Sequence, residues 1–73
     1  MPKLPVLSGD DLIRALTKGG FKKVRQKGSH VSLCKGGFRT VIPLHKDLSP
    51  GTLLGILHQA GLTRDDLLRL LEH

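Results

Sequence analysis

Two glycine-containing breaks in the middle of the chain constrain its fold more than any other feature. Residues 27–29, with the sequence KGS, are typical of a turn, and the glycine pair at 36–37 is typical of a two-residue hairpin loop. They separate three short segments over residues 21–26, 30–35 and 38–43. Short segments joined by tight turns favour a meander of three antiparallel strands.

The second segment has the clearest strand pattern. Val31 and Leu33 alternate with polar side chains, which predicts one apolar and one polar face. By this alternation His30 belongs to the polar face. In the third segment Val41 and Ile42 blur the pattern, and in the first, where only Phe21 and Val24 are apolar, it is weaker still.

Helices flank the three strands. Ser8 as N-cap, Asp11 in the capping-box position and the glycine pair at 19–20 predict a helix over residues 9–18. Ser49 and Pro50 begin a second helix, which Gly61 ends. Its expected buried face is Leu53, Leu54, Ile56 and Leu57.

A third, short helix follows at the C-terminus. Thr63 is its expected N-cap, and Asp66 stands in the capping-box position. We therefore expect a single domain over residues 1–73, with an extended leader over residues 1–7. The fold class is α+β, with the α-β-β-β-α order of a double-stranded-RNA-binding domain, helices on one face of the sheet, and the short last helix added. This order is a fold analogy and carries no information about catalysis.

The charge pattern points to a polyanionic partner. The net charge is +6, from 12 Lys and Arg against 6 Asp and Glu. No acidic residue lies between Lys18 and Lys46, and a one-sign block attracts a polyanion. Nucleic acid is favoured over a merely solubilising surface because the block lies in structured segments. The block consists of Lys18, Lys22, Lys23, Arg25, Lys27, Lys35, Arg39 and Lys46.

Several classes of function are disfavoured. A single cysteine, Cys34, makes no internal disulfide and suits a reducing compartment. The N-terminal segment lacks the apolar core of a signal peptide, and no run is long enough to span a bilayer, so we expect a cytoplasmic protein without a membrane partner. His30 and Cys34 would lie about 13 Å apart on a strand, too far to share a metal ion. We expect no metal site and no cofactor.

Cleavage of RNA makes lighter demands than these excluded chemistries. RNA carries its own nucleophile, the 2′-hydroxyl, so the protein needs a proton carrier and positive charge near the phosphate. Histidine is the natural carrier, and His30, at the start of a strand within the basic block, is the best candidate. A turn histidine with no chemical role is the alternative. His45 is expected in a loop, His58 at the edge of the helix–sheet interface, and His73 at the chain end.

The start of the second helix has two interpretations. A helix N-terminus offers free N–H groups to a phosphate, and Lys46, Ser49 and Thr52 surround this one. It is equally well explained as an ordinary capped helix start, and both interpretations can hold together.

Three elements of the sequence, in order and at matching spacing, resemble the HicA-type (YcfA-like) toxin family. They are the Gly-Phe after the first helix, the run RQKGSH at the second strand, and the stretch PLHKDLSPGTLLGILHQAG. The resemblance covers nearly the whole chain. Members of the family typically end near the second helix, so the last helix would be an addition.

The resemblance implies a fold like that of double-stranded-RNA-binding domains, an mRNA interferase activity that blocks translation, and a HicB-type antitoxin that covers the active site. It also implies that the histidine of a G-S-H motif is needed for cleavage. Here that histidine is His30, preceded by Gly28 and Ser29. The expected RNA-binding set is Lys22, Lys23, Arg25, Lys27, Gly28, Ser29, Lys35, Arg39 and Lys46, with Lys22, Lys27 and Lys46 stabilising charge by their position.

Two other readings stay open. A non-catalytic RNA-binding module would recognise A-form shape and phosphates, and it would not need His30. A regulator whose basic surface meets an acidic protein is a third reading. Because the chain has two Phe and no Trp or Tyr, base stacking is limited and we expect weak sequence preference.

Overall fold

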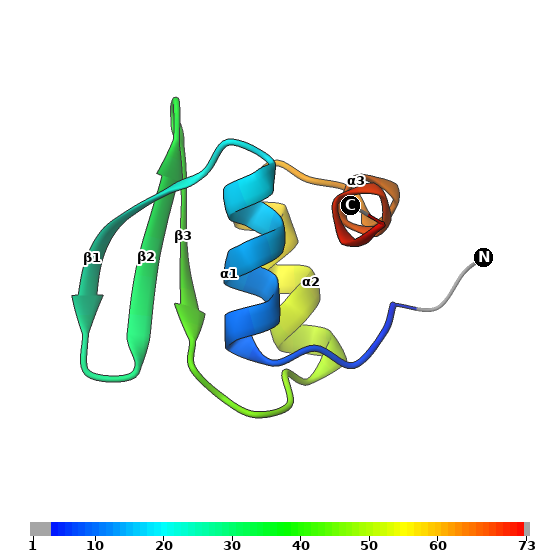
Figure 1. Cartoon of the computed structure of the whole chain (residues 1–73), viewed down its shortest axis with the longest axis horizontal. Helices are drawn as coiled ribbons and strands as arrows, with labels where there is room; N and C mark the ends of the chain where they lie inside the picture. The colour runs from blue at the N-terminus through cyan, green and yellow to red at the C-terminus, as the bar shows by residue number, and fades with distance from the viewer. Residues whose placement is uncertain (1–3, 73) are drawn as a thin grey trace.

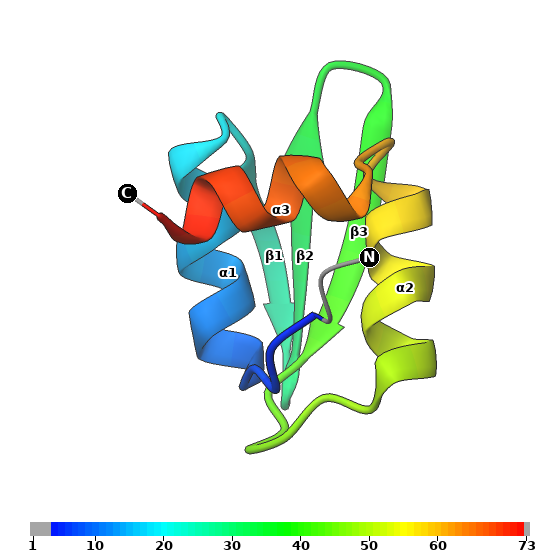
Figure 2. The same cartoon turned by 90° about the vertical axis from the view of Figure 1, so that its right-hand side faces the viewer.

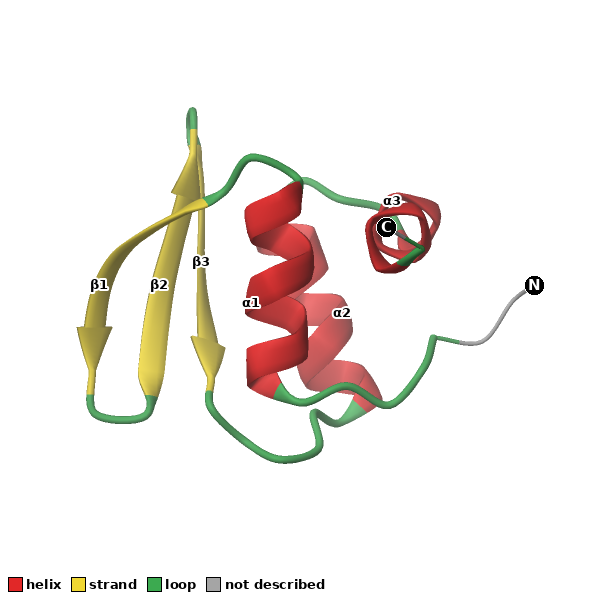
Figure 3. Cartoon of the chain, in the orientation of Figure 1, coloured by secondary structure: helices red, strands yellow, loops and turns green. Residues whose placement is uncertain are grey.

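The structure, a computed structural model, describes residues 4–72 and has the predicted order of elements (Figures 1 and 3). The α-β-β-β-α arrangement and the additional last helix are therefore confirmed. Residues 1–3 of the leader and His73 lie outside the described residues. The elements are α1 (Gly9–Lys18), β1 (Lys22–Lys27), β2 (His30–Lys35), β3 (Phe38–Pro43), α2 (Pro50–Gln59) and α3 (Arg64–Leu71).

The helix starts follow the local rules read from the sequence. The Ser8 hydroxyl accepts from the Asp11 N–H at 3.1 Å, and the Ser8 N–H donates to the Asp11 carboxylate at 3.3 Å. Thr63 and Asp66 form the same reciprocal pair at the start of α3, at 3.1 and 2.9 Å. Each pair satisfies backbone donors that the first helical turn would otherwise leave free, so both predicted capping boxes are confirmed.

The three strands form one antiparallel sheet in the order β1-β2-β3. Strand β1 begins one residue later than expected, because Phe21 belongs to the helix-to-strand connection. Its N–H donates to the carbonyl of Leu16, and its ring is buried. The pairing of β1 with β2 also shifts between Lys23 and Arg25, which marks a β-bulge at Val24.

The molecule has three layers. Helices α1 and α2 cover one face of the sheet, and the other face is left uncovered (Figure 1). Figure 2 shows α3 crossing α1 and α2 on the side away from the sheet. The helices pack closest to β3, while β1 projects beyond them and is exposed over its whole length.

A single apolar core lies between the sheet and the three helices. Leu33 and Ile42 from the sheet are fully buried against Leu12 of α1 and Leu53 of α2. Leu67 of α3 is also fully buried, so the additional helix is part of the same core.

One predicted core position of α2 is wrong. Leu54 is 36% exposed, because the buried stripe follows Leu53, Ile56 and Leu57 and leaves Leu54 to one side of it. Within residues 4–72, none of the helices has both the length and the apolar character needed to cross a membrane.

Candidate nucleic-acid interface

The uncovered face of the sheet is defined by the register of its strands. Paired residues of antiparallel strands project from the same face. Since Val31 and Leu33 are buried against the helices, His30 and the alternate residues of β2 project from the opposite side. We call this side the open face. It carries three rows of side chains: Lys27–His30–Pro43, Arg25–Ser32–Val41 and Lys22–Cys34–Arg39.

The open face is strongly cationic. Lys22, Arg25 and Lys27 project from β1, and Arg39 projects from β3. All four side chains are exposed, and no strand contains an acidic residue. Ser32, in the centre of the face, is only 8% exposed because Arg25 and Val41 flank it in register. The sheet therefore presents a broad positive surface on this side.

The bulge in β1 separates two adjacent lysines. Lys22 pairs with Cys34 and belongs to the open face, whereas Lys23 pairs with Leu33 and points to the helix side. There the Lys23 Nζ donates to the Gln26 Oε1 at 2.7 Å. Without the extra residue at Val24, strand alternation counted back from Lys27 would reverse these two positions.

Lys35 also lies on the helix side, because it pairs with Phe38 and follows the parity of the buried Leu33. Its Nζ donates to the Gly19 carbonyl at the end of α1 and lies 6.0 Å from the centre of the Phe21 ring. A cation at a helix C-terminus complements the helix dipole, which gives this lysine a structural role. The structure does not bring Lys23 and Lys35 together with His30.

His30 is the first residue of β2 and lies at the end of the open face beside the Gly28–Ser29 turn. Gly28 has φ of +58°, a left-handed conformation that favours glycine. The turn is held on both sides: the Gln26 amide donates to the Gly28 carbonyl at 3.3 Å, and the Leu44 N–H donates to the Ser29 carbonyl at 2.7 Å.

The His30 side chain is exposed and makes no hydrogen bond to another described residue. Its register partners are Lys27 on one side and Pro43 on the other. Directly paired side chains have Cβ atoms about 4.5–5.5 Å apart, so the Lys27 ammonium can reach a group bound at the imidazole. The imidazole is thus free to meet a substrate and has a cation beside it.

His45 and His58 lie off the open face. The backbone carbonyl of His45 accepts from the Gly9 N–H at 2.9 Å, which ties its loop to the start of α1. His58 is exposed on α2, behind the sheet. Lys46 is exposed in the same loop as His45. Among the histidines of residues 4–72, only His30 lies on a strand and in one of the basic rows.

At the start of α2 the hydroxyls of Ser49 and Thr52 are engaged with each other. Ser49 Oγ donates to Thr52 Oγ1 at 2.9 Å and accepts from the Thr52 N–H at 3.3 Å. These contacts are those of a capped helix start.

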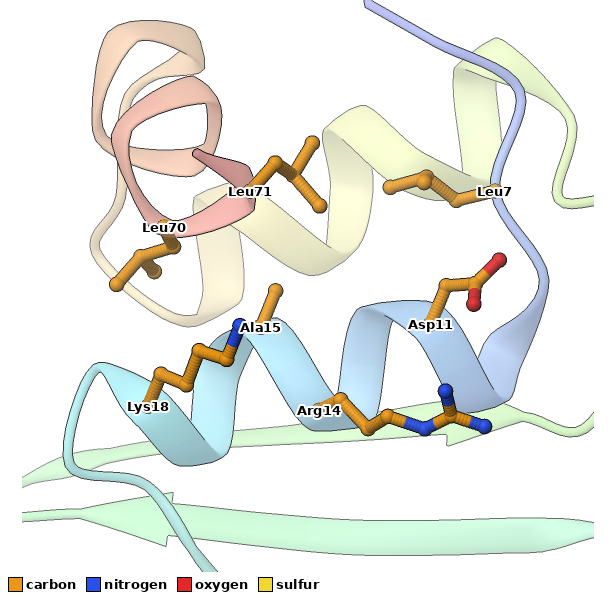
Figure 4. A pocket seen from close by; sticks show the side chains of 7 residues that line it. All are labelled: Leu7, Asp11, Arg14, Ala15, Lys18, Leu70 and Leu71. Carbon is orange, nitrogen blue, oxygen red and sulfur yellow. The ribbon is translucent and has the colours of Figure 1, made fainter. Parts of the chain in front are cut away.

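Two further features lie outside the candidate site. Among residues 4–72 no group of three or more His, Cys, Asp or Glu side chains is placed to hold a metal ion. A hollow of about 300 Å³ lies between α1 and α3, and Figure 4 shows its lining. None of its lining residues comes from the sheet, so it is separate from His30. They are Leu7, Asp11, Arg14, Ala15, Lys18, Leu70 and Leu71.

Fold and surface together define a small α+β domain, with a fold like that of double-stranded-RNA-binding domains, that exposes a cationic sheet face with one histidine at its end. Comparison with protein families gives a match to the family model described as "HicA toxin of bacterial toxin-antitoxin" over residues 9–62. The chain belongs to the HicA toxin family. Neither the comparison with curated proteins nor that with solved structures returned a match. The family match ends before α3.

Proposed function

We propose that this toxin-family chain is a metal-independent ribonuclease that cuts mRNA and so blocks translation. The observation that carries the proposal is the position of His30, an exposed imidazole in register with Lys27 at the end of a cationic face. General acid–base catalysis by a positioned side chain typically contributes about 10²–10⁴-fold to a rate. A cation beside the reacting phosphate stabilises the charge that develops in the transition state.

The proposed reaction uses the 2′-hydroxyl of the RNA as the nucleophile. Its oxygen attacks the adjacent phosphorus, the P–O5′ bond breaks, and a 2′,3′-cyclic phosphate and a free 5′-hydroxyl result. His30 either takes the proton from the 2′-hydroxyl or supplies one to the departing 5′-oxygen, and water exchanges the other proton. Lys27 balances the charge on the phosphate. No step requires a metal ion or a cofactor.

The proposed RNA-binding surface is the open face, with Lys22, Arg25, Lys27 and Arg39 distributed along it and the turn residues Gly28 and Ser29 at its His30 end. Each cation is exposed and projects from the same side of the sheet as His30. Lys46 lies in the loop that begins beside the His30 turn, and its contribution to charge stabilisation stays a prediction.

Membership of a toxin–antitoxin family implies an antitoxin partner. We propose that this antitoxin is of the HicB type and inhibits the toxin by covering the open face. A partner that buries the cationic rows would need acidic groups opposite them, because unpaired buried charges are costly.

The test is cleavage of a labelled mRNA by the purified protein in EDTA, with His30→Ala and His58→Ala compared side by side. His58 is a matched control because it is also an exposed histidine and lies off the open face. We expect the wild type and His58→Ala to cut and His30→Ala to lose at least about a hundredfold in rate. Folding of each variant is checked by circular dichroism.

Two outcomes would contradict the proposal. Cleavage by His30→Ala at the wild-type rate would remove His30 from the chemistry. If no protein cuts but all three bind RNA with the same steep salt dependence, the chain is a non-catalytic RNA-binding module.

A further inference from the structure

His30 lies at one end of the open face rather than at its centre. It belongs to the last row of paired residues, next to the β1–β2 turn, and two more rows lie on one side of it. On the other side the strands end. The chain after Pro43 is tied to the Ser29 carbonyl through Leu44 and then to Gly9 at the start of α1, so it leaves the open face at once.

The three rows share an arrangement across the sheet. Each row has one cation on β1: Lys27, then Arg25, then Lys22. On β3, Pro43 stands in the row of His30 and Val41 in the next row, and Val41 is 42% exposed. Charge therefore follows β1 lengthwise, while the β3 side near His30 is apolar. Phosphates are attracted to the cations along β1, and sugars and base faces fit the apolar side along β3.

We infer that a single RNA strand lies lengthwise along the open face, with its phosphates over Lys27, Arg25 and Lys22 and with His30 at the scissile phosphate. This inference rests on the proposed function and adds a direction to it. The nucleotides that the protein holds lie on one side of the scissile phosphate only. We call the line of cations Lys27, Arg25 and Lys22 the track, and Lys22 marks its far end.

The length of the track follows from strand geometry. His30 and Cys34 are four residues apart on β2, which corresponds to about 13 Å at about 3.3 Å per residue. Stacked nucleotides advance about 3.4 Å each, so no more than about four nucleotides fit between the cut and the Lys22 row. Nucleotides beyond this distance gain no contact with the open face.

The bulge at Val24 decides which lysine ends the track. It turns Lys22 toward the open face and Lys23 toward Gln26 on the helix side. Bulges re-aim side chains in this way, and here the re-aimed side chain completes the line of cations. Lys22 and Lys23 are adjacent, exposed and equally charged. Substituting each in turn therefore changes the net charge equally and differs only in the position of the lost charge.

The first experiment measures binding, in the His30→Ala background so that the RNA stays intact. Affinity for a fluorescently labelled 12-nucleotide single-stranded RNA is determined over a range of salt for Lys22→Gln and Lys23→Gln. A phosphate contact on single-stranded nucleic acid contributes about 0.7 to the slope of log affinity against log salt. We expect Lys22→Gln to flatten the slope by about that amount and to weaken binding about tenfold, and Lys23→Gln to leave the slope unchanged.

The second experiment measures cleavage by the otherwise wild-type protein. RNAs with one mapped cut site are shortened by one nucleotide at a time from either end. We expect kcat/KM to fall on shortening within about four nucleotides of the cut on one side, and to stay constant on the other. The Lys22→Gln defect should disappear once the nucleotides on the sensitive side are gone.

These measurements separate the two proposals. Equal effects of Lys22→Gln and Lys23→Gln on the salt slope would overturn the track, and so would equal sensitivity to shortening from both ends. Either result leaves a His30-dependent ribonuclease intact. If the wild type does not cut, the proposed function fails, while the contrast between the two lysines in binding still supports or overturns the track.

Discussion

At the scale of single residues, two strand-joining turns depend on a glycine in the left-handed conformation, and one of them directly precedes His30. Gly28 and Gly36 both have φ of +58°, and a Cβ at either would meet nothing within 4 Å. Each substitution by alanine therefore strains only the backbone, at about 1–2 kcal/mol. We expect Gly28→Ala and Gly36→Ala to lower the free energy of unfolding by similar amounts in denaturant titrations.

The two glycines differ in what they position. Gly28 precedes His30, whereas Gly36 lies in the hairpin at the far end of β2. We expect only Gly28→Ala to lower the cleavage rate of the folded protein, and Gly28→Asn to recover part of it, since asparagine tolerates this conformation. Equal loss of cleavage in Gly28→Ala and Gly36→Ala would show that the turn does not position His30.

The residue that we propose for the chemistry could be selected from the sequence, but the arrangement of the cations around it could be predicted only in part. His30 stands out because it follows a turn and heads a strand with clear alternation, which are local signals. The separation of Lys22 from Lys23 could not be predicted, because it depends on a bulge that appears only when β1 is paired with β2. Charge alone likewise groups Lys35 with the RNA-binding cations, and only the packing of Gly19 and Phe21 reveals its structural contact.

At the scale of the elements, helix α3 depends on its capping box. Hydrogen bonds from the backbone and side chain of Thr63 lower the pKa of Asp66 below its ordinary value of 3.8, and Arg69 adds to this. A carboxyl with a lowered pKa stabilises the folded state above its unfolded-state value, and the contribution is lost as the pH falls through the folded-state value.

We therefore expect Asp66→Asn to melt at a lower temperature than the wild type at pH 7, with the difference shrinking in acid below the ordinary value of 3.8. Asp65→Asn is the control, because Asp65 lies in the same helical turn and has no part in the Thr63 capping bonds. If the difference in melting temperature between Asp66→Asn and wild type persists unchanged into acid, it does not come from the ionised Asp66 carboxylate.

Element boundaries were largely predictable because they are set by local chemistry. Ser8, Ser49 and Thr63 cap the three helices as expected, and the turns at Gly28 and Gly36 join the strands. The errors arise where tertiary packing decides. The bulge moves the register of β1, and the packing of α2 leaves Leu54 outside the buried stripe.

At the scale of the whole molecule, α3 contributes to stability although it lies outside the family match. Leu67 is fully buried in the shared core, whereas Leu54 is partly exposed on α2. Truncating a buried leucine typically costs about 2–5 kcal/mol, and a small domain has little stability to spare. We expect Leu67→Ala to lower the denaturation midpoint strongly and Leu54→Ala to change it much less. Similar midpoints for the two variants would mean that α3 does not share the core.

The general architecture could be predicted from amphipathic helices on one side of a three-stranded sheet. The position of α3 as a third layer could not, because a short amphipathic helix fits several surfaces equally well. This layering matters for function. All three helices lie behind the sheet, which leaves its cationic face open.

In the proposed mechanism the RNA supplies the nucleophile and the protein supplies proton transfer, without a metal ion. The most direct measurement is single-turnover cleavage in EDTA of an RNA with one mapped cut site, beside the same RNA with a single 2′-deoxynucleotide at that site. We predict that both bind equally and that only the all-ribose RNA is cut. Cleavage of the deoxy-substituted RNA at the same position and rate would contradict the claim, because the 2′-hydroxyl could not then be the attacking group.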